Sequence, residues 1–101
     1  MSVHDLYHFD PTEKQAEILR VIFAYFDAGK APTYQQIKDS LSYGPAVSMN
    51  AIRCSLRILA REGAIVLVYG DDHLPEHVYG MKGYAKPTPA AYRRFRVTGA
   101  L

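Results

Sequence analysis

Residues 32–65 have the sequence P-T-Y-Q-Q-I-K-D-S-L-S-Y-G-P-A-V-S-M-N-A-I-R-C-S-L-R-I-L-A-R-E-G-A-I, and this stretch is the most informative in the chain. Thr33 follows a proline and is suited to cap a short helix, in which two apolar residues lie four apart on one face. The pair Gly44-Pro45 then forbids a continuous helix, because proline disfavours the helical conformation of the residue before it. Ser48 is suited to cap a second, longer helix. The stretch therefore predicts two helices joined by a turn.

The longer helix, expected from Ser48 to Arg61, has two different faces. Its inner face consists of Ile52, Leu56 and Leu59, which recur at helical spacing. Its outer face carries Asn50, Arg53, Arg57 and Arg61 at spacings of three and four. No acidic residue falls within this helix, whereas an ordinary surface helix mixes Glu with Arg to gain ion pairs. An acid-free face is what contact with phosphates and base edges requires; the plain alternative is a soluble, Arg-rich helix without a ligand.

Another helix is expected before this stretch. Thr12 and Gln15 are spaced as a capping box, in which each side chain satisfies a free backbone N–H group of the other. The apolar residues that follow at helical spacing are Ile18, Leu19, Ile22, Phe23 and Phe26. Gly29 is suited to end the helix, since a left-handed backbone is cheapest for glycine. We interpret the apolar stripe as core.

A strand is expected after the longer helix, and its partner is open. Residues 64–69, A-I-V-L-V-Y, are rich in β-branched side chains. Either residues 78–81 or residues 93–98 would supply the partner strand; we favour 93–98, and expect 86–89 to be irregular. The resulting fold class is α+β, a winged helix-turn-helix with three helices and a small antiparallel β-wing. We divide the chain into an arm (1–11), a winged helix-turn-helix domain (12–81) and a basic C-terminal tail (82–101), a candidate source of the last strand.

The net charge of +2 hides an asymmetry along the chain. Residues 1–47 carry −2, residues 48–76 carry −1, and residues 77–101 carry +5 with no acidic residue. A basic end on a slightly acidic domain indicates a polyanionic partner, with a solvated basic tail as the alternative. In a helix-turn-helix the first helix crosses the phosphate backbone, so its N-terminal residues are candidates as well. The candidate backbone contacts are Thr33, Tyr34, Gln35, Lys38, Arg61, Tyr69, His73, Lys82, Arg93, Arg94 and Arg96, with simple capping and surface positions as the alternative for those at 33–35.

Residues 11–69 resemble the N-terminal DNA-binding domain of the LexA repressor family. The features that carry the resemblance are P-T-E-K-Q-A-E-I-L at 11–19, P-T-Y-Q-Q-I at 32–37, and S-M-N-A with L-x-x-L-A-R-E-G-A-I within 48–65. They cover a little over half of the chain in matching order, although the turn is a few residues longer here. In that family the start of the third helix contacts bases. The resemblance therefore implies base contacts from Ser48, Asn50, Ala51, Arg53 and Cys54, to which we add Arg57.

Two departures from the family matter. The family commonly has acidic residues where this chain has Arg53 and Cys54, so the family's operator sequence cannot be carried over. LexA-type repressors also have a C-terminal self-cleaving domain that dimerises, for which 101 residues leave no room. We therefore expect no switching by autoproteolysis. A homodimer formed by other means, a monomer, and one part of a larger protein complex remain the alternatives.

Composition and motifs argue against other classes of protein. The length suits one domain, and a hydrophobic fraction of 49% argues against disorder. No apolar run approaches the roughly 20 residues that span a bilayer, and the mixed, acidic N-terminus is not a signal peptide. The single cysteine fits a reducing cytosol. His73-Leu74-Pro75-Glu76-His77 matches a zinc-hydrolase pattern, but Pro75 interrupts the helix that this chemistry needs. We predict a cytoplasmic, nucleoid-associated protein with no enzymatic activity, metal, cofactor or membrane partner.

These observations favour a sequence-preferring, double-stranded DNA-binding transcriptional regulator, with promoter occlusion and hence repression as its mode of action. The main alternative is a winged helix that serves as a protein–protein interaction module, for example in a replication or viral inhibitor complex. The eight tyrosines support this alternative, since tyrosine favours protein interfaces. A contiguous exposed Tyr/Phe patch away from the third helix would point to it.

Overall fold

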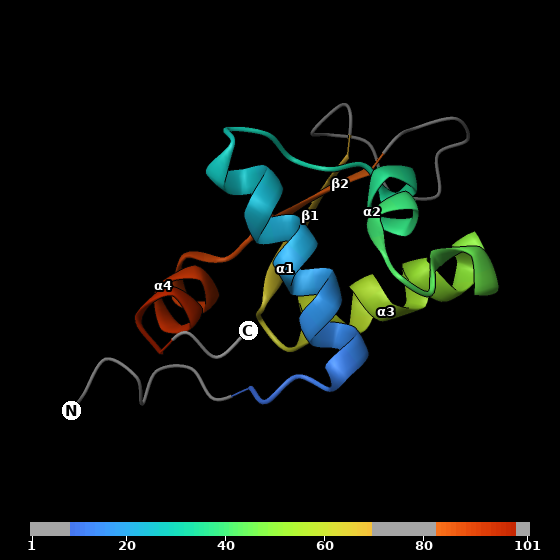
Figure 1. Ribbon diagram of the computed structural model, residues 1–101. Coiled ribbons are helices and arrows are strands. Elements are labelled where there is room, and N and C mark those ends of the chain that lie inside the picture. Colours follow the sequence, from blue (N-terminus) through green and yellow to red (C-terminus); the bar gives the residue numbers. More distant parts are fainter. Residues whose placement is uncertain (1–8, 70–82, 99–101) are drawn as a thin grey trace.

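The computed structural model describes residues 9–69 and 83–98, in which helices surround a small sheet (Figure 1). In chain order the elements are α1 (Glu13–Asp27), α2 (Tyr34–Ser40), the 3₁₀-helix η2 (Gly44–Ala46), α3 (Met49–Arg61), β1 (Ile65–Tyr69), β2 (Gly83–Pro87) and α4 (Pro89–Thr98). The fold class is α+β, as predicted, and the arrangement is compatible with a small winged helix-like fold. The described residues form four α-helices, however, and the prediction of three was wrong.

The predicted helix starts are confirmed. Thr12 and Thr33 each form a capping box, with Gln15 and Gln36 respectively. Ser48 caps α3 by accepting a hydrogen bond from the Ala51 N–H at 3.1 Å. Local capping chemistry therefore sets where each of the first three helices begins.

The turn between α2 and α3 also forms as predicted, and Gly44 explains how tightly it closes. A Cβ atom at this position would lie 2.0 Å from the Lys38 carbonyl oxygen, so any other residue would force the backbone apart. Pro45 is compatible with the short 3₁₀-helix at this point. The turn thus brings the start of α3 close to the end of α2.

The described partner of β1 is a segment that neither prediction named. β1 pairs antiparallel with β2, which places Ile65 opposite Pro87 and Tyr69 opposite Gly83. Residues 93–98 are helical, so their assignment to a strand was wrong, as was the irregular structure expected at 86–89. Residues 78–81 lie outside the described residues. Pro87 is tolerated in β2 because alternate residues point their backbone groups away from β1; Ala85, two positions earlier, donates its N–H to the Pro32 carbonyl at 3.1 Å.

The fourth helix lies in the segment predicted to be a basic tail. Thr88 caps it, since its Oγ1 accepts a hydrogen bond from the Ala91 N–H at 3.2 Å and donates one to the Gly63 carbonyl at 2.6 Å. Pro89 then occupies the first position of α4, where its missing N–H costs nothing. The Thr-Pro pair is thus a helix start, and its resemblance to a loop concealed that signal.

The core lies where α1, α2, α3, the sheet and α4 meet. It includes Ile18, Leu19, Ile22 and Phe23 from α1, Ile37 from α2, Ile52, Leu56 and Leu59 from α3, Ile65 and Ala85 from the strands, and Ala91 and Phe95 from α4. This confirms the predicted inner faces of α1 and α3 with one exception. Phe26 was expected in the core and is 43% exposed, because it lies at the end of α1 and packs edge-on against Tyr92 of α4.

Candidate nucleic-acid interface

All six predicted base-contacting residues are exposed on α3 or at its N-terminal cap. Ser48, Asn50, Ala51, Arg53, Cys54 and Arg57 are each exposed to solvent. Because successive helical residues are about 100° apart, Asn50, Arg53, Arg57 and Arg61 fall within about 80° of one another around the helix axis. We call these four residues the polar row of α3. Within the described residues, α3 carries no acidic side chain.

The polar row therefore presents three guanidinium groups and one amide to solvent. Guanidinium and amide groups can each form two parallel hydrogen bonds with a base edge, and guanidinium groups also bind phosphate. Ser48 differs from the others because its hydroxyl already serves as the cap of α3. The row suits a polyanion whose edges carry hydrogen-bond acceptors.

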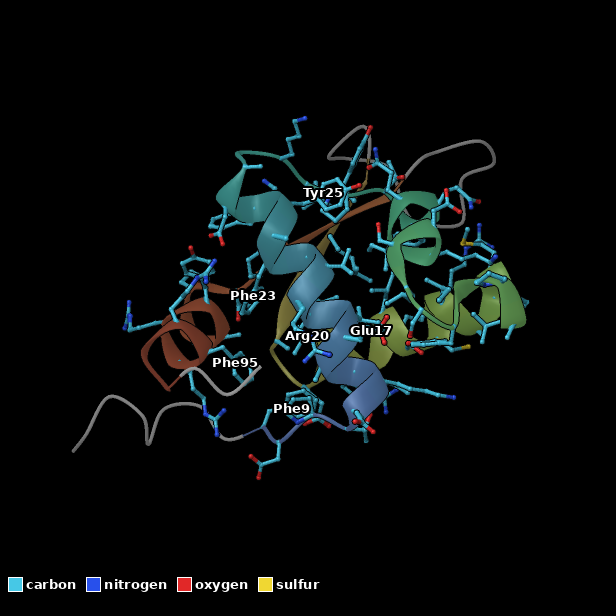
Figure 2. The ribbon with its side chains drawn as sticks, viewed as in Figure 1. Phe9, Glu17, Arg20, Phe23, Tyr25 and Phe95 are labelled. Carbon is cyan, nitrogen blue, oxygen red and sulfur yellow. The ribbon has the colours of Figure 1, made fainter. Side chains whose placement is uncertain are left out.

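Glu17 of α1 holds the turn that leads into α3. Its carboxylate accepts hydrogen bonds from the Ser42 backbone N–H at 2.5 Å and from the Ser42 hydroxyl at 2.9 Å. Figure 2 shows Glu17 on the flank of α1 that faces α3. The backbone hydrogen bond from Ser42, then the hydroxyl bond, lowers the pKa of Glu17. A carboxylate on α1 thereby holds the turn between α2 and α3 in place.

Tyr43 adds a second link between α1 and this turn. Its hydroxyl donates a hydrogen bond to the Lys14 carbonyl at 3.4 Å, and the Lys14 ammonium lies 5.2 Å from the centre of its ring. Partial burial, followed by the charge of Glu17, raises the pKa of Tyr43. The two contacts reinforce the position that Glu17 gives to the turn.

The Glu17 contact predicts a pH dependence of stability. Because the pKa of Glu17 is lowered on folding, its carboxylate stabilises the folded state above the pKa that Glu17 has in the unfolded chain, about 4.5. That contribution disappears as the pH falls through the lower folded pKa. Urea titrations of wild type and Glu17→Gln should differ in the free energy of unfolding at about pH 7, and the difference should shrink toward about pH 3. A difference that stays constant over this range would contradict the role of the charge.

The candidate phosphate contacts of α2 divide into two groups. Gln35 is exposed and donates a hydrogen bond to Asp39, and Lys38 is half-buried. The Thr33 side chain serves in its capping box. Tyr34 was expected outside and is 8% exposed, so that expectation was wrong. Its ring fills the space beside Gly83, where a Cβ would lie 2.8 Å from the ring.

The basic residues of α4 are not brought to the polar row. In Figure 1, α3 and α4 lie on opposite sides of α1. Arg94 forms an ion pair with Asp10 at 3.5 Å, and Arg96 forms one with Asp27. Arg93 is exposed. The arginines of α4 therefore do not extend the polar row, and two of the three are paired with aspartates.

The remaining predicted contacts are only partly described. Tyr69 is the last residue of β1, and its side chain lies outside the description, as do His73 and Lys82. The histidine pattern at 73–77 falls in the same undescribed segment. Among residues 9–69 and 83–98, no group of His, Cys, Asp and Glu side chains could hold a metal ion. In that same part of the chain, no helix has the length and apolar character needed to cross a membrane.

Comparison with protein-family models, curated proteins and solved structures found no match to this chain.

Proposed function

We propose that this protein is a sequence-preferring, double-stranded DNA-binding regulator of transcription that uses a winged helix-turn-helix. The observation that carries the proposal is the polar row of α3, an exposed face of three arginines and one asparagine on a helix without acidic residues. Glu17 of α1 holds the turn that leads into this helix. The resemblance of residues 11–69 to the DNA-binding domain of LexA-type repressors agrees with the same use of α3.

In this proposal α3 enters the major groove of the duplex. Asn50 contacts adenine, and Arg53 and Arg57 contact guanine or phosphate. Gln35, Lys38 and Arg61 contact the backbone at the edges of the groove. Occlusion of a promoter by the bound protein would make it a repressor, associated with the nucleoid in the cytoplasm. We assign Arg93, Arg94 and Arg96 to a different surface, because α4 lies across α1 from α3.

The proposal is tested by fluorescence anisotropy of a labelled random duplex, titrated with the protein at several salt concentrations. We expect the logarithm of the affinity to fall linearly with the logarithm of the salt concentration, by about 0.9 for each phosphate contacted. Selection from a randomised duplex library should then enrich a preferred sequence. Absence of binding at low salt would reject the proposal.

A second candidate function is supported by the other side of the molecule. Phe26 and Tyr92 form an aromatic surface there, with their rings 5.1 Å apart. Arg96, which is paired with Asp27, lies 5.1 Å from the centre of the Tyr92 ring. Aromatic residues and arginine are enriched in protein interfaces. The surface suits a protein partner or a second copy of the chain. Sedimentation equilibrium of wild type and Phe26→Ala tests the second copy, since only a dimer that uses this surface would be weakened by the substitution.

A further inference from the structure

The exposed side of α3 carries a second, apolar row beside the polar one. Ala51, Cys54 and Ile58 are spaced three and four residues apart and fall within about 60° of one another around the helix axis. All three are exposed, and the Ile58 residue is 41% exposed. We call them the apolar row. It lies next to Asn50, Arg57 and Arg61 and continues the same outward surface.

Ile58 is one of three large apolar side chains that are exposed in the described part of the chain. Phe26 packs against Tyr92 of α4, and Val66 stands opposite Lys86 on the outer face of the sheet. Ile58 instead lies on α3, beside the arginines of the polar row. A single exposed isoleucine is common in folded proteins. Ile58 is informative only because it lies beside the polar row.

We propose that the apolar row contacts thymine methyl groups in the major groove, with Ile58 as the principal contact. The inference rests on the proposed function and names which base pairs the surface prefers. In the major groove, the thymine C5-methyl group is the apolar feature that distinguishes base pairs, and apolar side chains recognise it. The surrounding cations select duplex DNA as the occupant, because an apolar protein surface would bury these charges without partners.

The dimensions of the row agree with this occupant. From residue 51 to residue 58 an α-helix rises about 10.5 Å, which equals the rise of about three base pairs. Asn50 is suited to bind adenine with two hydrogen bonds. A helix that lies along the groove would therefore place an adenine contact and methyl contacts within one short A·T-containing block. The polar row would contact the adjoining guanines and phosphates.

The experiment replaces thymine with uracil, which removes one methyl group and leaves base pairing intact. A preferred duplex is first selected, and each thymine is then changed singly to deoxyuridine before anisotropy titration. At one or more positions we expect binding to weaken about fourfold, the cost of one unburied methyl group. For Ile58→Ala, the uracil and thymine duplexes should bind equally at that position. The exposed side chain and the high helix propensity of alanine should leave the fold intact.

Val66→Ala is the matched control, because it removes apolar atoms from another exposed residue, on β1 and outside the apolar row. This variant should retain the full difference between thymine and uracil. If DNA binds with a clear preference and no uracil duplex is weakened, the apolar row does not contact methyl groups and only this inference falls. A uracil effect that is unchanged at every position in Ile58→Ala would show that Ile58 is not the principal methyl contact and would also overturn the inference. Failure of all duplexes to bind would overturn the proposed function itself.

Discussion

Phe95→Ala is expected to lower the free energy of unfolding by about 3–5 kcal/mol, a large share of the stability of a small domain. Phe95 is 3% exposed and its ring centre lies 5.9 Å from that of Phe23. Figure 2 shows both rings in the space between α1 and α4. Removing the Phe95 ring leaves a cavity that α4 cannot fill, since its backbone is fixed by the Thr88 cap. The free energy of unfolding follows from urea titration monitored by circular dichroism.

The control for Phe95→Ala is Arg93→Ala, two residues earlier on the exposed side of α4. This change should alter the free energy of unfolding by no more than about 0.5 kcal/mol. A similarly small effect of Phe95→Ala would mean that α4 attaches loosely and that residues 82–101 behave as the tail expected from composition. A large effect would show that α4 unfolds together with the rest of the domain.

The sequence was most informative where local chemistry is sufficient. Capping residues and apolar spacing predict α1, α2 and α3 because the hydrogen bonds and inner faces of a helix depend on nearby residues. The partner of β1 depends instead on a residue pairing across the sheet, which no local pattern specifies. β2 contains Gly83, Ala85 and Pro87, all poor strand formers, so its propensity opposed the correct assignment. Tertiary contacts, including the bond from Ala85 to Pro32, override that propensity.

In the candidate site, too, local spacing predicts some features and tertiary contacts determine the others. The polar row follows from helical spacing alone, and the structure places all its members in solvent as predicted. Tyr34 could not be placed in this way, since its burial depends on Gly83, far away in sequence. The position of the C-terminal arginines was likewise hidden, because net charge says nothing about which side of the molecule a segment occupies. Helical spacing also places Ala51, Cys54 and Ile58 in one row, but only the exposure of Ile58 in the structure distinguishes it from a core residue.

Arg53→Ala is expected to weaken binding to a selected preferred duplex by about 1–3 kcal/mol while changing binding to random duplexes much less. A guanidinium group that contacts a base edge stabilises only those duplexes that have that base at that position, whereas a phosphate contact is equally available on every sequence. Arg53 is exposed on the polar row, so its removal should not disturb the core. The measurement is anisotropy of both duplexes at one fixed salt concentration, with circular dichroism to verify folding.

Arg93→Ala removes the same charge from an exposed position on α4 and is the matched control for Arg53→Ala. Since α4 lies across α1 from α3, this variant should bind both duplexes nearly as well as wild type. Equal losses from the two variants on every duplex would show that general charge, and not base contact, explains the affinity. A loss confined to Arg53→Ala and to the preferred duplex would place sequence recognition on α3. It would also separate the DNA-facing side of the molecule from the aromatic surface of α1 and α4.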